Sequence, residues 1–509
     1  MSEIIAAVDA GTSAVRSVLF DTDGTEIHRE YQEFESIYPK PSWVEQNAED
    51  WWNAASSTLQ ACISKSGSSV ERIAAVAVTN QRETIVPVDE SGNPLRNAIV
   101  WQDRRTVPQC EHLREMLSER EIYSITGLSI DPYFSAPKIL YLKEHEPETY
   151  SETHKFLLVH DFIVHRFCNC MVTDYSNASR TMLFDIENAR WSDEILDTLD
   201  ILPERLPQPV ESGTVVGEVT QEASRETGLA VGTPVISGGG DQQCAALGVG
   251  VVREGRTKAT TGTGTFMLAH TDIPKFDPEM RVLCSRHVVP DAFVVEASMF
   301  TTGAALRWFR DNLGYEECMK AEAVEVDVYD VITEEAAVVP AGSEGIIHIP
   351  HFTGAGAPHW NPDARAMFAG LALGHNKEHL IRAILEGVSY ELRSNQEVMR
   401  GLDIPISELR VTGGAARSDV WMQIQSDVLG IPVIRTAMEE ATSLGAAILA
   451  CRGVGIFDSV AKAAEEMVQP LEPLLPRKEN QDVYEQGFRR FKRLYNVASD
   501  IKYDAHYSL

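Results

Sequence analysis

A carboxylate that follows three glycines is the first candidate for chemistry in this sequence. Asp241 stands after Gly238–Gly240 in "ISGGGDQQCAAL", and an apolar run, "TPVIS", precedes the glycines. Glycine tolerates backbone angles and close approaches that other residues forbid, so this pattern predicts a tight turn at the end of a buried strand. Asp241 would then face a cleft and act as a general base toward a hydroxyl substrate. The alternative is that Asp241 caps the helix expected over the following residues.

Two adjacent charged residues form the second candidate. Arg82 and Glu83 follow the apolar run "IAAVAVT", where charged side chains are expected only at an edge or in a cleft. An arginine donor beside a glutamate acceptor would suit a polyol, because each hydroxyl both donates and accepts. Trp101 could pack against the carbons of such a ligand. A surface ion pair is the alternative interpretation.

Three turns rich in glycine could bind phosphate. The first, "DAGTSAVR", follows a predicted strand that ends at Asp9, and this carboxylate could hold Mg²⁺ through water. The second contains Gly262, Thr263 and Gly264, and the third contains the pair "GG" at 413–414. Turns from two domains could hold the phosphates of a nucleotide between them. Neither the P-loop pattern nor the Rossmann dinucleotide pattern is present, and the first turn taken alone could be a simple hairpin.

The elements around these residues predict α/β domains with mixed sheets. Short apolar runs over residues 4–34 predict an antiparallel meander, and a similar hairpin is predicted over 257–271, which suggests two related halves. Residues 408–430 and 68–86 are each predicted to form a strand, a turn and a helix. The main boundary is placed near residues 246–258.

Two segments have the apolar spacing of amphipathic helices, 379–399 and 483–498. The second has apolar residues at Tyr484, Phe488, Phe491 and Tyr495, and its basic cluster is expected to be a solvated face. The histidine pairs, His348 with His351 and His160 with His165, have no third ligand at a recognisable spacing, so they are expected to be structural.

Composition excludes several classes of protein. The 509 residues predict two or more domains, and the net charge of −30 argues against nucleic acid or an anionic membrane as a partner. The eight cysteines form no CxxC pair. The chain has no signal-like start and no apolar run long enough to cross a bilayer. A cytoplasmic location without membrane insertion is therefore expected.

Nine ordered segments resemble the FGGY family of carbohydrate kinases, from about residue 4 to about residue 455. They are "DAGTSAVRSVLFD", "TNQRETIV", "AIVWQDRRT", "GLSIDPYFSAPKILYLKEH", "VTDYSNASRTMLFDI", "GGGDQQCAALG", "TGTGTFML", "FAGLALGHNKEHLIRAILE" and "TGGAARSDVWMQIQSDVLG". The resemblance implies an α/β fold of two actin-like (ribonuclease H-like) domains, with mixed sheets flanked by helices and an ATP cleft between them. Residues 1–250 would bind the acceptor and form the first phosphate turn, and residues 251–509 would bind the nucleotide. ATP, Mg²⁺ and a homodimer or homotetramer are also implied.

The resemblance assigns roles to individual residues. Asp241 matches the catalytic base and Asp9 the magnesium-associated aspartate. The acceptor-binding residues would be Arg82, Glu83, Trp101, Tyr133, Asp241, Gln242 and Phe266. The nucleotide-binding residues would be Gly11, Thr12, Ser13, Arg16, Gly262, Thr263, Gly303, Arg307, Gly414 and Ser418. The chain departs from the family pattern at "GTSAVR", at Arg307, which replaces a usual glutamine, and at Ser418, which replaces a usual asparagine.

The acceptor residues resemble those of family members that phosphorylate glycerol. We therefore expect transfer from ATP to glycerol, giving sn-glycerol 3-phosphate, with Asp241 as the base. The alternatives are a kinase for a pentulose, such as xylulose, or for another polyol. An alternative of a different class is an ATPase switch of the actin or chaperone kind.

Overall fold

The computed structural model describes residues 3–499 and 501. Packing divides the chain into two compact units. Of the described residues, the first unit comprises 3–252, 270–295 and 440–469, and the second comprises 253–269, 296–439, 470–499 and 501. These units follow packing rather than chain order, so the division into 1–250 and 251–509 stays a prediction.

The central sheet of the first unit is built on the predicted meander. Strands β1 (Ile4–Ala10), β2 (Ala14–Asp21) and β3 (Glu26–Glu33) run antiparallel to their neighbours. Strand β5 (Ile73–Asn80) runs parallel to β1, and β14 (Pro234–Gly240) runs parallel to β5. With β13 (Val215–Glu218) at one edge, the order is β13-β14-β5-β1-β2-β3. Strands β1 and β5 are almost continuously apolar, as expected of strands that are covered on both faces.

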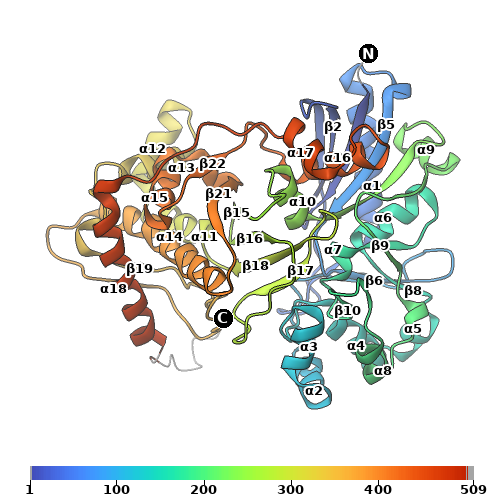
Figure 1. The fold of residues 1–509 in the computed structure, drawn as a ribbon, viewed down its shortest axis with the longest axis horizontal. Helices are drawn as coiled ribbons and strands as arrows, with labels where there is room; N and C mark the ends of the chain where they lie inside the picture. The colour runs from blue at the N-terminus through green and yellow to red at the C-terminus, as the bar shows by residue number, and fades with distance from the viewer. Residues whose placement is uncertain (1–2, 500, 502–509) are drawn as a thin grey trace. The chain divides into compact units, whose positions relative to one another are not determined.

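Helices cover both faces of this sheet. Helices α1 (Ala48–Ser66) and α6 (Val159–Cys168) share one apolar cluster with the sheet, which includes Trp51 and Phe162. Helices α10 (Asp241–Gly248) and α16 (Ala441–Gly453) lie on the other side (Figure 1). They pack so closely that a Cβ on Gly248 would lie 1.8 Å from the Ala441 carbonyl oxygen. Only glycine fits there.

The second sheet repeats the first arrangement. Strands β15 (Gly255–Thr261) and β16 (Thr265–Thr271) form the predicted hairpin, and β21 (Ile406–Thr412) and β22 (Val433–Arg435) continue the sheet in parallel from β15. Its order is β17-β18-β16-β15-β21-β22, with β17 at Leu283–Arg286 and β18 at Phe293–Met299. The expected α/β fold with two mixed sheets flanked by helices is confirmed.

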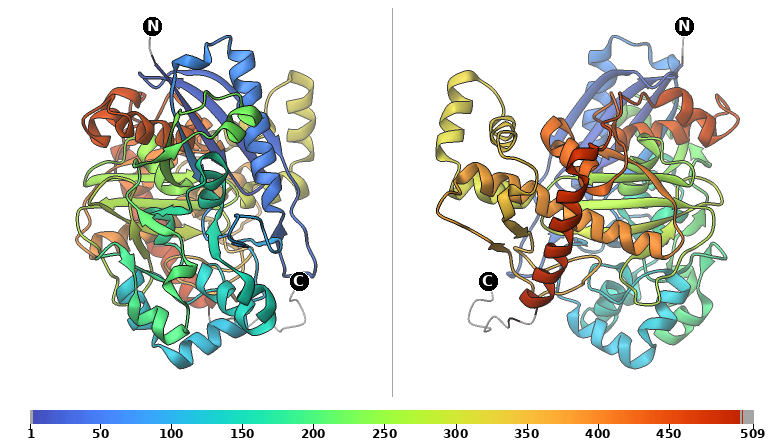
Figure 2. Two further views of the ribbon diagram at one scale, coloured as in Figure 1. Left: turned by 90° about the vertical axis from the view of Figure 1, so that its right-hand side faces the viewer. Right: turned by 60° about the vertical axis from the view of Figure 1, so that its left-hand side comes forward.

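Both predicted amphipathic helices form in the second unit. Helix α14 spans Lys377–Gly401 and α18 spans Gln481–Ser499. The rings of Tyr484, Phe488 and Phe491 all contact the ring of Tyr390 on α14, and Figure 2 shows α18 in red beside α14 in orange. The basic cluster is exposed, as expected, at Arg489, Arg490, Lys492 and Arg493.

One predicted unit is wrong. Residues 408–430 form β21 and then α15 (Asp419–Leu429), but 68–86 contains no helix after its strand. The chain turns at 81–84 and continues as β6 (Ile85–Val88), because the β-branched run "TIV" favours a strand.

Smaller elements complete the structure. A four-stranded sheet in the first unit has the order β4-β7-β6-β8, with β4 at Glu45–Gln46, β7 at Ala98–Ile99 and β8 at Lys155–Leu158. Within the described residues, no helix is long and apolar enough to cross a membrane. The other helices and the short strand β9 are α2 (Val107–Met116), α3 (Glu119–Thr126), α4 (Ser135–His145), α5 (Pro147–Glu152), β9 (Val172–Asp174), α7 (Tyr175–Ala178), α8 (Asp193–Leu199), α9 (Gln221–Thr227), α11 (Gly303–Asn312), α12 (Tyr315–Val324), α13 (Val328–Ala336) and α17 (Val460–Met467).

Candidate active site

Three neighbouring parallel strands of the first unit end in polar residues. Asp9 lies near the end of β1, the Arg82–Glu83 pair follows β5, and Asp241 follows β14. Because β1, β5 and β14 run parallel, these residues meet at one edge of the sheet. In open α/β sheets, ligands bind beyond the carboxyl ends of the strands. The sheet topology thus gathers residues that are far apart in the sequence.

The glycines at the end of β14 allow close contacts with β5 and with the Arg82 side chain. A Cβ on Gly238 would lie 1.9 Å from the carbonyl oxygen of Val78, and a Cβ on Gly240 would lie 2.6 Å from Cδ of Arg82. Either contact is too short for a real side chain. The glycines therefore let β14 lie against β5 and let the Arg82 side chain cross over the last strand residue.

Asp241 is the first residue of α10 and not its cap. Gly240 occupies the N-cap position, where no side chain makes a cap hydrogen bond. The Asp241 carboxylate accepts the Gln242 backbone N–H through Oδ1 at 2.7 Å, and the Gln242 side-chain amide lies 3.4 Å from Oδ2. A negative charge in the first turn also interacts favourably with the helix dipole.

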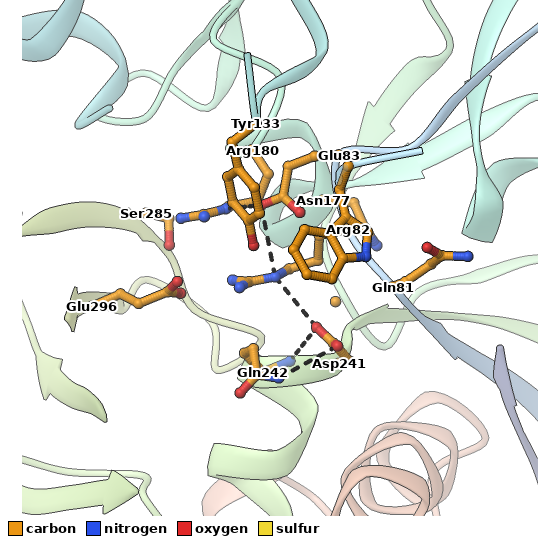
Figure 3. Close-up of polar contacts among 12 residues, drawn as sticks. Gln81, Arg82, Glu83, Tyr133, Asn177, Arg180, Asp241, Gln242, Ser285 and Glu296 are labelled. Carbon is orange, nitrogen blue, oxygen red and sulfur yellow. Dashed lines mark hydrogen bonds and ion pairs between the residues drawn. The ribbon is translucent and has the colours of Figure 1, made fainter. Parts of the chain in front are cut away.

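Arg82 is directed at Asp241, as Figure 3 shows. Nε of Arg82 lies 3.3 Å from Oδ1 of Asp241, and its Nη1 donates to the Gln243 side-chain oxygen at 3.1 Å. The Arg82 side chain is 2% exposed and that of Asp241 is 29% exposed. A buried cation thus lies beside a carboxylate that still reaches solvent.

Glu83 has a closer partner than Arg82. Its carboxylate accepts from Nε of Arg180 at 2.6 Å, whereas Nε of Arg82 is 4.0 Å away. All three side chains are buried, so the surface ion pair considered for Arg82 and Glu83 is excluded. Glu83 also has a φ of 65°, a left-handed conformation that is costly for a residue with a side chain. Arg180 was missed as a site residue, although it lies in the segment "VTDYSNASRTMLFDI" that resembles the kinase family.

A buried polar network supports the turn below Asp241. The Gly240 backbone N–H donates to Oγ of Ser176 at 2.9 Å, and this hydroxyl donates to Asp174 at 2.6 Å. Ser176 and Asp174 are fully buried. Sequence reasoning missed both, because nothing in their spacing relates them to residue 240.

Two aromatic residues stand next to the charged pair. The Trp101 and Tyr133 rings meet edge to face with centroids 5.4 Å apart. The Trp101 indole N–H donates to Oγ1 of Thr12 at 3.0 Å, and its backbone N–H donates to Oγ1 of Thr84 at 3.1 Å. Trp101 therefore contacts the first glycine-rich turn. Phe266, another of the expected acceptor-binding residues, lies on β16 within the second unit.

The first turn is a tight hairpin between β1 and β2. The Gly11 N–H donates to the Ala14 carbonyl at 3.0 Å, and the carbonyl of the exposed Ser13 accepts from Phe34 at 3.0 Å. The Gln46 side chain donates to the Thr12 carbonyl at 2.7 Å. Hydrogen bonds to the rest of the unit thus fix the backbone of this turn.

Asp9 lies in a field of negative charge. Burial raises the pKa of Asp9 to about 7; the Arg16 charge opposes this rise, and the carboxylates of Asp241 and Glu440 add to it. Glu440, which the sequence did not indicate, accepts from Arg16 at 2.7 Å and from Arg29 at 3.0 Å. A divalent cation here would offset the repulsion among these carboxylates.

The carboxylate of Asp9 fits a magnesium ion that takes most of its ligands from water and a nucleotide. Among residues 3–499 and 501, no group of three His, Cys, Asp or Glu side chains could hold a metal ion. Mg²⁺ commonly takes one or two carboxylates and completes its shell with water and substrate phosphates. Asp9 could therefore serve such an ion when a nucleotide supplies the remaining ligands.

The second unit brings two of the expected nucleotide segments together. The N–H groups of Gly303 and Ala304 donate to the carbonyls of Gly262 and Thr263 at 3.0 and 3.1 Å. A Cβ on Gly303 would lie 2.2 Å from the Gly262 carbonyl oxygen. Nη2 of Arg307 lies 3.4 Å from Oγ1 of Thr263, so this departure from the family pattern places a cation at the turn.

The third glycine turn follows the neighbouring strand β21. Gly413 has a φ of 88°, and a Cβ there would lie 2.6 Å from the Thr261 carbonyl oxygen. Gly414 is exposed, and its Cβ would meet no atom within 4 Å. Ser418 caps α15 by accepting the Trp421 N–H at 3.2 Å. The exposed backbone at 262–263 and 413–414 thus lies on adjacent parallel strand ends.

The two mixed sheets flanked by helices, with polar residues at the carboxyl ends of parallel strands, place the molecule in the class of two-domain actin-like α/β folds. Models of the N-terminal and C-terminal domains of the FGGY family of carbohydrate kinases match residues 4–248 and 257–454. The chain belongs to this family, and it is an ATP-dependent kinase with an alcohol group as acceptor.

Known relatives differ in their acceptors. A glycerol kinase of Shigella flexneri is 39% identical over 475 residues, which cover 91% of this chain and 92% of that protein. The crystal structure of a xylulose kinase from Rhodospirillum rubrum has a TM-score of 0.90 at 27% identity, covering 97% of this chain and 99% of that one. A gluconate kinase from Lactobacillus acidophilus has a TM-score of 0.90 at 23% identity and 99% coverage of both chains, which shows the shared fold.

Proposed function

We propose that this kinase transfers a phosphoryl group from ATP to a terminal hydroxyl of glycerol, giving sn-glycerol 3-phosphate. Glycerol kinases that are 39% identical over 91% of the chain support this choice of acceptor. The charged and aromatic residues of the first unit support it as well, because a small polyol needs several donors and acceptors and one apolar wall.

The observation that carries the proposal is the contact between Arg82 and Asp241. Their 3.3 Å separation joins a buried guanidinium to a carboxylate that remains partly exposed. The Arg82 side chain is fixed in turn by its bond to the Gln243 side-chain oxygen, so one Asp241 oxygen has a defined partner while the carboxylate stays open to a hydroxyl. The first turn of α10 and the Gln242 N–H fix the direction of the carboxylate.

In the proposed reaction the protein mainly aligns its two substrates. Asp241 accepts the proton of the attacking hydroxyl as the new oxygen–phosphorus bond forms, and ADP leaves with the electrons of the broken bond. Arg82, Gln242 and Glu83 orient the hydroxyls of the acceptor, and Arg180 holds Glu83 in place. Trp101 and Tyr133 cover the acceptor carbons, and Phe266 would join them.

Nucleotide binding is assigned to backbone turns. The exposed backbone at 262–263 and 413–414 would face the nucleotide, with Gly303 and Arg307 supporting the first of these turns. Thr12, Ser13 and Arg16 would contact phosphates at the first turn, and Ser418 would contact the nucleotide beyond Gly414. Bound Mg²⁺ would shield the phosphate charges, and Asp9 would hold it through water.

The direct test is ATP turnover with a panel of acceptors: glycerol, xylulose, ribulose, erythritol, xylitol, gluconate and no acceptor. We expect the highest kcat/KM with glycerol. A preference for a pentulose or for gluconate would keep the kinase and overturn the acceptor. Turnover that does not depend on any acceptor would favour an ATPase switch. The resemblance also implies a cytoplasmic homodimer or homotetramer, which light scattering after size-exclusion chromatography would check.

Replacing Gly414 with alanine tests the nucleotide assignment. The new Cβ meets no protein atom within 4 Å, so the stability should change by less than about 0.5 kcal/mol. If the nucleotide lies against this backbone, the added methyl group prevents their close contact. The KM for ATP should then rise about 5-fold to 30-fold, which corresponds to a loss of about 1–2 kcal/mol of binding free energy.

Gly401→Ala is the matched control, because that glycine lies in open space at the end of α14. It should leave the KM for ATP unchanged. An unchanged KM for ATP in Gly414→Ala as well would remove Gly414 from the nucleotide site.

A further inference from the structure

Lys138 is a buried lysine beside the acceptor residues that the proposed reaction does not use. It lies in the first turn of α4 and is fully buried. Both features are unfavourable, because burial removes the hydration of the ammonium group and the N-terminal end of a helix repels positive charge. When a protein keeps a charged residue in so unfavourable a position, the position is often part of a functional site.

The ammonium group of Lys138 is held by three carbonyl groups in a row. Nζ donates to the carbonyls of Pro132, Tyr133 and Phe134 at 3.1, 2.6 and 2.8 Å. An ammonium group carries three protons, so these three acceptors take its full donor capacity. The contacts fix three consecutive residues of the loop that leads into α4.

That loop contacts the acceptor residues at two points. The Tyr133 ring lies edge to face against Trp101, and the Tyr133 N–H donates to Asp131 at 2.8 Å. The Ser135 hydroxyl donates to the Glu83 carbonyl at 3.1 Å. The backbone of Tyr133 is therefore held at its N–H by Asp131 and at its carbonyl by Lys138.

We propose that Lys138 is a positioning residue that holds Tyr133 and the Glu83 turn in the geometry that binds the acceptor. The inference rests on the proposed acceptor site but not on which polyol binds there. The protons of its ammonium group are taken by the three carbonyls, so Lys138 would act through Tyr133 and the Glu83 turn; its loss should weaken acceptor binding and leave the nucleotide unaffected.

The charge on Lys138 adds a pH dependence to this role. Burial lowers the pKa of Lys138 to about 7, while nearby acidic groups oppose the shift. Below that pH the ammonium group serves three carbonyls, and above it the neutral amine has only two protons to donate. The KM for the acceptor should therefore rise as the pH increases through about 7. The charged and titratable groups that face this region are Glu83 with Arg180, Asp103 with Arg105, Asp131 with Arg104, and Cys110 on α2.

Lys138→Met tests the inference, because methionine keeps most of the side-chain length and removes every donor. We expect the KM for the acceptor to rise about tenfold or more, with the KM for ATP unchanged within about twofold. The variant should also lose the rise of the acceptor KM between about pH 6 and pH 8.5 that we expect for the wild-type enzyme. Lys143→Met is the matched control, because Nζ of Lys143 on the same helix donates to the carbonyls of Leu199 and Asp200, away from Tyr133. It should leave both KM values unchanged.

Hydrogen exchange read by mass spectrometry separates this inference from the proposed function. Backbone amides near residues 133–136 should exchange faster in Lys138→Met than in Lys143→Met, whatever the acceptor is. If no acceptor in the panel is phosphorylated, the proposed function fails and the exchange result still decides the role of Lys138. Equal rises in both KM values, or unchanged exchange at 133–136, would overturn the inference. If Lys138→Met does not fold, the wild-type pH profile decides: an acceptor KM that is flat across pH 7 would overturn it.

Discussion

Asp241→Asn is expected to lower kcat by about 100-fold to 10,000-fold, the range that a general base contributes. The asparagine side chain has nearly the same shape, and its oxygen can still accept the Gln242 N–H. It cannot take up the proton of the attacking hydroxyl. The KM for ATP should stay within about twofold, because the change removes proton transfer and leaves nucleotide contacts in place. A coupled assay of ADP release at saturating glycerol measures the effect.

Asp458→Asn provides the control for this experiment. The Asp458 side chain is 90% exposed, and its cation partner is Lys462 on α17. The same chemical change there should leave kcat unaltered. Near-normal turnover of Asp241→Asn would show that another group accepts the proton.

Arg180→Met is expected to destabilise the first unit by about 3–5 kcal/mol, the usual cost of removing one partner from a buried ion pair. The guanidinium of Arg180 lies 2.6 Å from the Glu83 carboxylate, and both side chains are almost fully buried. Its loss leaves the buried Glu83 carboxylate without its closest cation, with Nε of Arg82 4.0 Å away. Urea denaturation followed by tryptophan fluorescence measures the free energy of unfolding.

The double variant Glu83→Gln/Arg180→Met separates stability from function. Removing the carboxylate charge together with the cation should restore much of the lost stability, because no uncompensated charge remains. Turnover should stay low, because Glu83 is assigned to the acceptor hydroxyls. If the losses of unfolding free energy in Glu83→Gln and Arg180→Met simply add up to that of the double variant, the two residues do not form an ion pair that stabilises the fold.

The sequence was sufficient to predict the general design of this molecule. The apolar runs separated by Gly, Thr and Asp predicted the β1–β2–β3 meander and the β15–β16 hairpin, because period and turn chemistry are local properties. The position of Asp241 at a strand end could be predicted for the same reason. The helix expected within 68–86 was wrong, because Thr84, Ile85 and Val86 favour a strand more strongly than the preceding turn favours a helix.

Partners that lie far apart in the sequence could not be predicted. Arg180 contacts Glu83, and Glu440 contacts Arg16, only because the fold brings distant segments together. From the sequence, Lys138 looks like an ordinary polar residue of a helix. Only its burial against three carbonyls, which the structure shows, distinguishes it. Pairings of this kind depend on tertiary packing, which residue type and local spacing do not encode.

The return of residues 440–469 to the first unit has a consequence for synthesis of the protein. Helix α16 covers one side of the first sheet, packed against α10 at Gly248 and Gly445. When synthesis reaches Val252, the strands of the first sheet have been translated. Helix α16, which covers one side of that sheet, has not. At a synthesis rate of about 5–20 residues per second, this face of the sheet stays uncovered for on the order of ten seconds or more before α16 is made. The nascent chain must stay free of aggregation during this interval, so folding of the first unit ends late in translation.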